Sequence, residues 1–182
     1  KQDLIKITNS AIYSREIVKK LMFFSCEMPY NKEILEIKPI IKQVLSFLEP
    51  KFNKQGVKHQ LDFENSKLKA QIDNVQFTQL LFNILLNSLY VSPKDSVIKI
   101  VVTNDETNFF IEIADEGTGI SNELKAIVFD PFYTSKPLGE GTGLGLSVVH
   151  GIIKSHKGDI KISDNKPKGA IFTIMLPLYL KG

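Results

Sequence analysis

The segment over residues 75–90 is the feature that most constrains the fold of this chain. It is apolar at nearly every position, including the run Leu-Leu-Phe-Asn-Ile-Leu-Leu-Asn. This pattern predicts a helix that a core must surround. Asp73 or Asn74 is suited to cap the first turn, and Pro93 ends the helix because proline has no backbone N–H to donate.

Two asparagines interrupt this apolar helix. Asn83 and Asn87 are four residues apart and therefore lie on one face. Buried amides need hydrogen-bond partners, which backbone groups or a ligand could provide. The side-chain oxygen of Asn87 could complete the shell of Mg²⁺, an ion that usually keeps several waters and its substrate phosphates.

The remaining segments alternate between strand and helix patterns. We expect an α+β fold, a two-layer sandwich in which about three helices cover one face of one mixed sheet. Residues 116–142 are loop-rich, and so long a loop in a compact domain is usually a lid or a binding loop. The other expected elements are strands over 33–38, 57–63, 68–72, 97–103, 109–114, 159–163 and 170–176, and helices over 39–52, 123–128 and 143–156.

The N-terminal segment has a different pattern. Apolar or small residues recur every three or four positions over residues 1–28, which predicts a long helix that ends at Met28-Pro29. An isolated helix of this kind needs a partner for its apolar face. We therefore expect two parts, a helix over 1–29 and a domain over 30–182, and we expect a fragment of a longer protein because the chain opens at Lys1.

The composition excludes several classes of function. The net charge of +3 comes from scattered lysines with Arg15 as the one arginine, so a nucleic-acid-binding stripe is absent from the sequence. Cys26 is the one cysteine, which excludes an internal disulfide and suits a reducing compartment. No apolar run is long enough to cross a bilayer. We expect a cytoplasmic location without direct membrane contact from this chain, whether or not its parent is anchored.

Four glycines alternate in the sequence just before a predicted helix. Gly139, Gly141, Gly143 and Gly145 could bring backbone N–H groups and the helix N-terminus against phosphate oxygens. A flexible hinge is an equally good interpretation of these glycines alone. A P-loop is excluded because Leu-Gly-Leu stands where Gly-Lys and Ser or Thr are required, and the polar residues 133–136 replace the strand of a dinucleotide fingerprint.

Asp115 follows directly after the predicted strand 109–114. The segment continues as Glu-Gly117-Thr-Gly119-Ile120, so backbone can approach a ligand closely beside the carboxylate. That carboxylate can accept a hydrogen bond from an exocyclic amino group such as that of adenine. The alternative is an aspartate that caps a turn.

These segments, in this order, resemble the ATP-binding catalytic domain of sensor histidine kinases, within the gyrase, Hsp90, histidine kinase and MutL superfamily. The resemblance covers residues 30–180. Asn83 and Asn87 match the asparagine box, and residues 115–120 match the first glycine box. Residues 129–132 match the phenylalanine box and residues 139–145 the second glycine box.

The resemblance implies ATP and Mg²⁺ as ligands. It implies that Asp115 holds the adenine amino group, that Asn87 ligates the metal, and that Lys136 reaches the terminal phosphate from a lid over 121–141. Asn87 and Lys136 would be the catalytic residues. Tyr90 departs from the pattern, because many relatives carry a basic or amide residue there. The implied nucleotide-binding residues are Asn83, Asn87, Asp115, Gly117, Gly119, Ile120, Phe132, Thr134, Ser135, Lys136, Gly139, Gly141, Thr142, Gly143, Leu144, Gly145 and Leu146.

The implied reaction is transfer of the γ-phosphoryl group to a histidine, and then to an aspartate of a response-regulator receiver domain. Asn83 stands where the ATPase relatives carry a water-activating glutamate, which favours a kinase over a hydrolase. Residues 14–25 are similar to the second helix of the dimerisation and phosphoacceptor stem, which implies a homodimer. A related ATPase, a serine kinase of the anti-sigma type and a non-catalytic scaffold are the alternatives.

The chain does not contain the phosphoacceptor motif, a histidine followed by an acidic residue on such a helix. For His59, His150 and His156 we expect surface or packing roles. The acceptor histidine is therefore expected outside this chain.

Overall fold

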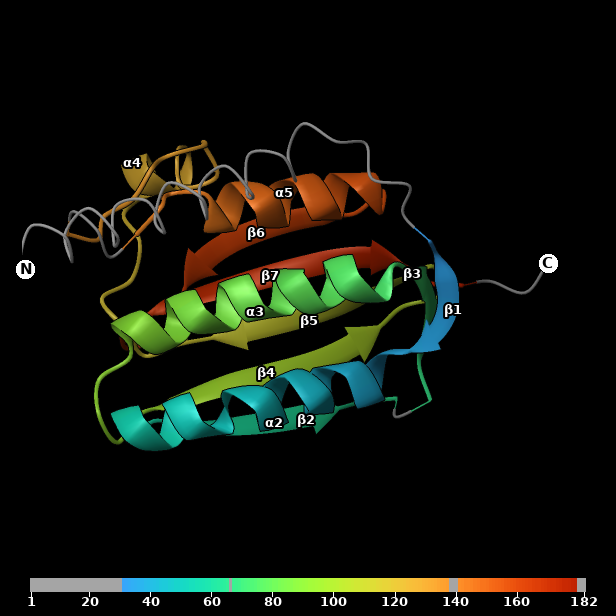
Figure 1. Ribbon diagram of the computed structural model, residues 1–182, viewed down its shortest axis with the longest axis horizontal. Helices are drawn as coiled ribbons and strands as arrows, with labels where there is room; N and C mark the ends of the chain where they lie inside the picture. Colours follow the sequence, from blue (N-terminus) through green and yellow to red (C-terminus); the bar gives the residue numbers. More distant parts are fainter. Residues whose placement is uncertain (1–30, 66, 138–140, 180–182) are drawn as a thin grey trace, which may run out of the picture.

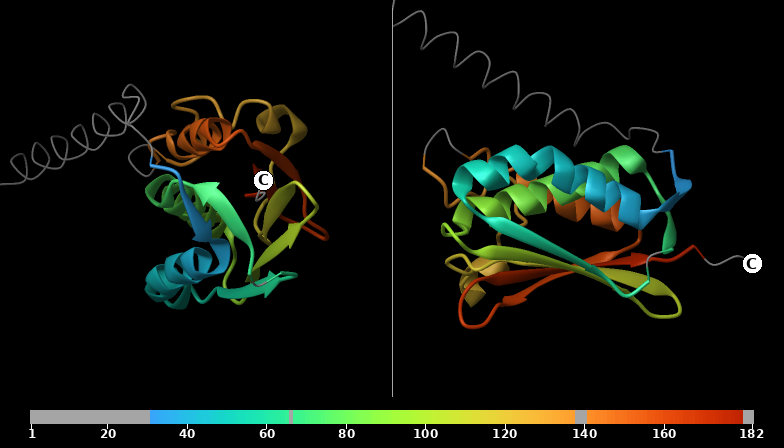
Figure 2. Two further views of the ribbon diagram at one scale, coloured as in Figure 1. Left: turned by 90° about the vertical axis from the view of Figure 1, so that its right-hand side faces the viewer. Right: turned by 90° about the horizontal axis from the view of Figure 1, so that it is seen from below.

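A five-stranded sheet and three long helices form the body of the protein (Figures 1 and 2). The computed structural model describes residues 31–65, 67–137 and 141–179. The elements in chain order are β1 (Glu33–Glu36), α2 (Ile37–Gln55), β2 (Lys58–Phe63), β3 (Lys69–Ile72), α3 (Asn74–Val91), β4 (Val97–Asn104), β5 (Asn108–Ala114), α4 (Asn122–Lys125), α5 (Gly145–Ser155), β6 (Asp159–Asp164) and β7 (Ala170–Pro177).

The sheet is mixed, with strand order β2-β4-β5-β7-β6. Strands β2 and β4 run parallel, whereas the other neighbours are antiparallel. Helices α2, α3 and α5 lie side by side on one face of this sheet (Figure 2). The predicted two-layer α+β sandwich is confirmed, and β4 and β5 form a hairpin within its sheet.

Strands β1 and β3 form a separate two-stranded sheet, which the sequence did not predict. They pair antiparallel, with Glu33 opposite Ile72 and Glu36 opposite Lys69. Both strands have four residues, too few for their residue pattern to indicate which sheet they join. The pair lies at the end of the helical layer where α3 begins (Figure 1).

Helix α3 occupies the centre of the helical layer. Its side chains Phe77, Leu80 and Ile84 are all buried against the sheet and the neighbouring helices. The N-cap is Asp73, whose carboxylate accepts a hydrogen bond from the backbone N–H of Gln76 at 2.9 Å. This cap and the apolar pattern account for the position of the helix, which matches the prediction within one residue at each end.

His156 joins the start of α3 to the end of α5. Its Nε2 accepts a hydrogen bond from the backbone N–H of Asp73 at 3.1 Å. Its Nδ1 therefore carries the proton and donates to the carbonyl oxygen of Ile152 at 2.8 Å. Burial lowers the pKa of this imidazole. His156 is thus a neutral structural residue, 5% exposed.

The other two histidines also make packing or surface contacts. The Nε2 atom of His59 lies 2.7 Å from a carboxylate oxygen of Glu49. The His150 ring lies against Phe129, with 5.6 Å between the ring centroids. The helix predicted over residues 1–28 lies outside the described residues. Among the helices that the structure does describe, none is long and apolar enough to cross a membrane.

Candidate nucleotide-binding site

A pocket of about 400 Å³ opens at the end of the helical layer opposite β1 and β3. Its walls come from the second half of α3, the first turn of α5, the start of β7 and the loop between β5 and α5. Segments that are far apart in the sequence therefore meet here. The pocket combines apolar side chains with a few polar groups, which is the usual character of a small-molecule site.

The amide side chains of Asn83 and Asn87 line the pocket on the α3 side. Gly145, at the start of α5, faces them closely. A Cβ atom on Gly145 would lie 3.8 Å from the Asn83 side-chain oxygen and 3.9 Å from the Asn87 side-chain nitrogen. The N-terminus of α5 and the two amides consequently share one region of the pocket, where backbone N–H groups can bind an anion.

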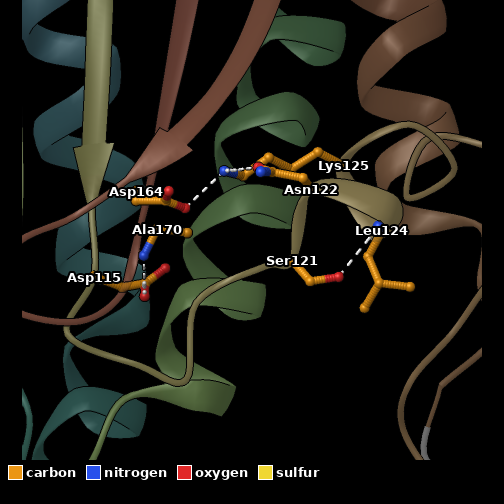
Figure 3. A network of polar contacts seen from close by, with 7 residues as sticks. All are labelled: Asp115, Ser121, Asn122, Leu124, Lys125, Asp164 and Ala170. Atoms are coloured by element: carbon orange, nitrogen blue, oxygen red, sulfur yellow. Dashed lines mark hydrogen bonds and ion pairs between the residues drawn. The ribbon is translucent and has the colours of Figure 1, made fainter.

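Asp115 lies at the base of the pocket and is 1% exposed. Its Oδ1 accepts a hydrogen bond from the backbone N–H of Ala170 at 3.1 Å (Figure 3). The same oxygen accepts a second hydrogen bond from the backbone N–H of Gly117 at 3.0 Å. No backbone N–H of the described residues donates to Oδ2. Two backbone N–H groups thus fix one carboxylate oxygen of this side chain.

Burial raises the pKa of Asp115, while hydrogen bonding from Gly117 and Ala170 and the nearby Ser88 hydroxyl oppose that shift in part. Ser88 is 0% exposed and follows Asn87 on α3. Its hydroxyl lies near the Asp115 carboxylate, although the described residues complete no well-formed hydrogen bond to it.

The loop between β6 and β7 supports Asp115 from behind. The side-chain amide of Asn165 donates to the backbone oxygen of Asp115 at 2.7 Å. Gly169 has φ of +123° and packs against the same backbone oxygen, so any side chain at this position would collide with it. The sequence did not indicate this support, because the two loops are about fifty residues apart in the chain.

Lys136 closes the opposite side of the pocket. Its ammonium lies 3.3 Å from the side-chain oxygen of Asn87 and 4.1 Å from the centroid of the Tyr90 ring. The hydroxyl of Thr134 accepts the backbone N–H of Lys136 at 3.1 Å and stabilises the turn that presents the side chain. A positive charge therefore lies beside the two asparagines.

Two glycines allow the loop to fold tightly around Lys136. Gly143 has φ of +66°, and a side chain there would collide with the backbone of Phe132. A side chain at Gly141 would collide with the hydroxyl of Thr134. The left-handed conformation of Gly143 also explains why α5 begins at Gly145 and not at the predicted position 143.

The loop is anchored at α4 (Figure 3). The hydroxyl of Ser121 caps this short helix by accepting the backbone N–H of Leu124 at 3.4 Å. The ammonium of Lys125 lies 2.6 Å from a carboxylate oxygen of Asp164 at the end of β6 and 3.1 Å from the amide oxygen of Asn122. This ion pair connects the first part of the loop to the sheet.

The structure places most of the residues expected to bind nucleotide around this one pocket. Those that line it are Asn83, Asn87, Asp115, Gly119, Ile120, Thr134, Ser135, Lys136, Gly141, Thr142, Gly143, Gly145 and Leu146.

Three of the expected residues lie off the pocket wall. Gly117 is buried against the Val91 side chain, where an added Cβ would collide. Leu144 is buried, at 1% exposed, while Phe132 is 59% exposed at the surface. Gly139 lies outside the described residues.

Several lining residues were not expected from the sequence. They include Tyr90 and Val91 at the end of α3 and Ala170 and Phe172 on β7. The residues of β7 carry no motif, and only strand pairing brings them beside Asp115. The others are Leu86, Thr118, Leu124, Val128 and Tyr133.

Asn87 is the pocket residue that the sequence assigned to a metal ion. The described residues contain no group of three or more His, Cys, Asp or Glu side chains that could hold a metal. Asn87 offers one neutral oxygen, so a magnesium ion here would take its other oxygens from phosphates and water.

The comparisons with known proteins agree with this geometry. The family model of the histidine kinase-, DNA gyrase B- and HSP90-like ATPases matches residues 72–180. The chain belongs to this family. The match begins at the end of β3 and includes every pocket element described above. ATP is accordingly the ligand of the fold.

The individual relatives are sensor kinases. Sporulation kinase A of Bacillus subtilis is 32% identical over 146 residues, which are 80% of this chain and 24% of that protein. The nucleotide-free catalytic domain of histidine kinase ThkA is 28% identical with a TM-score of 0.75, covering 81% of this chain and 96% of that one. ThkA in complex with response regulator TrrA is 26% identical with a TM-score of 0.81, covering 95% of this chain and 49% of that one.

The chain spans 24% of the length of Sporulation kinase A and 31% of the length of sensor histidine kinase ZraS of Escherichia coli.

Proposed function

We propose that this chain is the ATP-binding catalytic part of a sensor histidine kinase that works in the cytoplasm. It binds ATP with Mg²⁺ and donates the γ-phosphoryl group to a histidine outside the chain, for relay to a receiver-domain aspartate. The observation that carries the proposal is the meeting of Asp115, Asn87 and Lys136 in one pocket. These three residues are far apart in the sequence, and the fold brings them together.

Asp115 is assigned the adenine end. Its Oδ2 can accept a hydrogen bond from the exocyclic amino group, because Oδ1 is already held by two backbone N–H groups. The apolar side chains of Ile120, Val91 and Phe172 give the base a surface to pack on. A purine with a carbonyl in place of the amino group would meet the carboxylate with a second acceptor and be rejected.

Asn87, Lys136 and the start of α5 are assigned the phosphate end. Asn87 would hold Mg²⁺ through its side-chain oxygen, and the metal would neutralise phosphate charge. The ammonium of Lys136 would stabilise charge on the terminal phosphate. The N-terminus of α5 would direct its N–H groups at the same oxygens. The protein thus positions the groups and stabilises charge, which is the main requirement of phosphoryl transfer.

Asn83 favours transfer to an imidazole over hydrolysis. It lines the pocket one turn before Asn87, where a water-activating base would be useful. An amide cannot take up the proton of an attacking water. The loop that carries Lys136 would instead shield the phosphates from solvent.

We further propose the arrangement of the longer protein. The domain comprises residues 30–182, and residues 1–29 belong to a stem helix through which two copies pair. The partner that receives the phosphoryl group is a response-regulator receiver domain, as the complex of the relative ThkA with TrrA supports.

The test is incubation of the full-length protein with γ-labelled ATP and Mg²⁺. We expect label that is lost in acid and kept in base, the behaviour of phosphohistidine. Asn87→Ala should reduce the labelling rate at least about tenfold, a loss of about 1.4 kcal/mol of stabilisation. Asn53→Ala, an exposed residue on α2, is the matched control and should label normally. Release of free phosphate without any labelled histidine would show a hydrolase instead.

A further inference from the structure

Tyr90 is a pocket residue to which the proposed mechanism gives no role. It lies three residues after Asn87 on α3, so the two side chains project from the same face. Tyr90 lines the pocket and is 46% exposed. A half-exposed aromatic ring contributes little to the core, and its position at the mouth of a pocket indicates a contact with something else.

The ring has a cation on its face. The ammonium of Lys136 lies 4.1 Å from the Tyr90 ring centroid, well within the range of about 6 Å over which a cation is attracted to an aromatic face. The same ammonium lies 3.3 Å from the side-chain oxygen of Asn87. Helix α3 therefore supports this charge at two points, a ring and an amide oxygen.

Only one of these two supports is compatible with bound magnesium. The Asn87 oxygen is the proposed metal ligand, and a divalent cation repels an ammonium at contact distance. Lys136 must therefore leave that oxygen when the metal binds. The Tyr90 ring does not compete for the metal, because Mg²⁺ prefers oxygen ligands. The ring can keep the ammonium near the phosphates after Asn87 is taken.

We propose that Tyr90 is a positioning residue, whose ring holds the Lys136 ammonium at the terminal phosphate once Mg²⁺ occupies the Asn87 oxygen. This inference rests on the proposed roles of Asn87 and Lys136. It explains how the chain works without a basic or amide side chain at position 90. The loop supplies the positive charge through Lys136, and the Tyr90 ring on α3 holds that charge in place.

The experiment compares Tyr90→Leu with Tyr90→Phe by titration with ATP and with ADP at saturating Mg²⁺. Leucine removes the aromatic face, whereas phenylalanine keeps it and removes only the hydroxyl. Tyr90→Leu should weaken ATP binding about two- to fivefold, the size of one cation–π contact, and leave ADP binding nearly unchanged. Tyr90→Phe should behave like the original protein. Equal losses for both variants, or for both nucleotides, would overturn the proposal.

Lys136→Gln provides the second arm of the test. If Tyr90 acts through Lys136, then Tyr90→Leu has no further effect on ATP affinity in the Lys136→Gln background. A full additional loss would show that the ring acts independently and would overturn the proposal. Unfolding midpoints of all variants check that the fold is intact, as expected for a side chain that is 46% exposed.

The same variants separate this inference from the proposed function. If the metal assignment fails, Asn87→Ala leaves Mg²⁺-dependent binding unchanged, but Tyr90 and Lys136 remain coupled. If the positioning role fails, that coupling disappears and Asn87→Ala remains damaging.

Discussion

The two ends of the pocket are built in different ways. At the adenine end, two backbone N–H groups bind one oxygen of Asp115, and Asn165 and Gly169 fix its backbone. At the phosphate end, the Lys136 ammonium, on a loop, lies 3.3 Å from the Asn87 side-chain oxygen and 4.1 Å from the centroid of the Tyr90 ring. On the proposed assignment, the first end is formed before nucleotide arrives, whereas the second exchanges contacts when nucleotide and metal bind.

Burial accounts for the difference. Hydrogen bonds among buried groups gain strength from a low local dielectric and are costly to break. Loop residues with few buried contacts can rearrange at small cost. Recognition of the base is therefore assigned to the rigid end, and adjustment to the phosphates and metal to the adaptable end. Substitutions in the support of the rigid end should mainly lower the free energy of unfolding. Substitutions in the loop at the adaptable end should mainly weaken nucleotide binding.

Gly169→Ala should have the largest effect. The added methyl group would enter the space of the Asp115 backbone oxygen at a φ of +123°, which alanine rarely adopts. We expect a loss of about 2–4 kcal/mol in the free energy of unfolding, measured by urea titration. Gly151→Ala is the control, because nothing lies within 4 Å of an added Cβ there. That helix substitution should stabilise the protein by about 0.5–1 kcal/mol. Similar losses in both variants would refute the rigid support of Asp115.

Asp115→Asn should weaken ATP binding about 10- to 100-fold with little loss of stability. The asparagine oxygen can still accept from Gly117 and Ala170, and its NH₂ group then faces the amino group of adenine, donor against donor. Fluorescence titration measures the affinity.

The pH dependence of binding tests the same assignment. Burial raises the pKa of Asp115. ATP affinity should therefore be highest above that pKa. On acidification it should begin to fall at a higher pH than it would if Asp115 had the ordinary pKa of an aspartate. The asparagine variant should lack this decline. Unchanged affinity in Asp115→Asn would remove the residue from the binding site.

Gly143→Ala should affect binding more than folding. Alanine at a φ of +66° costs about 1–2 kcal/mol, and its methyl group would meet the Phe132 backbone. The loop can move away and relieve most of this strain, because Phe132 is 59% exposed, but the pocket wall then changes shape. We expect ATP affinity to fall about fivefold, with the unfolding free energy changed by less than about 1 kcal/mol. A loss of stability equal to that of Gly169→Ala would show that both ends are equally rigid.

The smallest effect concerns His156, which lies away from both ends of the pocket. Burial keeps its pKa below the ordinary value, so the unfolded chain binds the proton more readily than the folded one. The stability contribution is complete above about pH 6.5 and is lost as the pH falls from there towards the folded pKa. Urea midpoints across this range should decrease, whereas those of His156→Gln should change less. An identical slope in both proteins would contradict the buried neutral ring.

The local elements could be predicted from the sequence because their signals are local. The apolar run and Asp73 predicted α3, and the four-residue spacing placed Asn83 and Asn87 on one face. Asp115 was expected at the end of a strand, and β5 ends one residue before it. Helix periodicity and strand ends repeat over a few residues, so they can be recognised without tertiary structure.

The surroundings of these residues could not be predicted in the same way. Ala170 donates to a carboxylate 55 positions earlier, and only the pairing of β5 with β7 brings the two together. Gly117 and Leu144 belong to the right motifs but are buried off the pocket wall. A motif indicates which segment reaches a site, whereas packing decides which side chains face it.

The attachment of the chain at the far end of the helical layer has a mechanical consequence. The backbone N–H of Asn31 donates to Asp73 at the start of α3, and the ammonium of Lys32 donates to the Ser155 oxygen at the end of α5. The eighteen residues of α3 extend about 27 Å from there to the pocket, and α5 runs back antiparallel beside it. A force applied at residues 31 and 32 would therefore act on α3 and α5. The opposite ends of these helices carry Asn87 and Gly145. Nucleotide affinity measured in Lys32→Ala would show how strongly the contact with the end of α5 affects the phosphate end of the pocket.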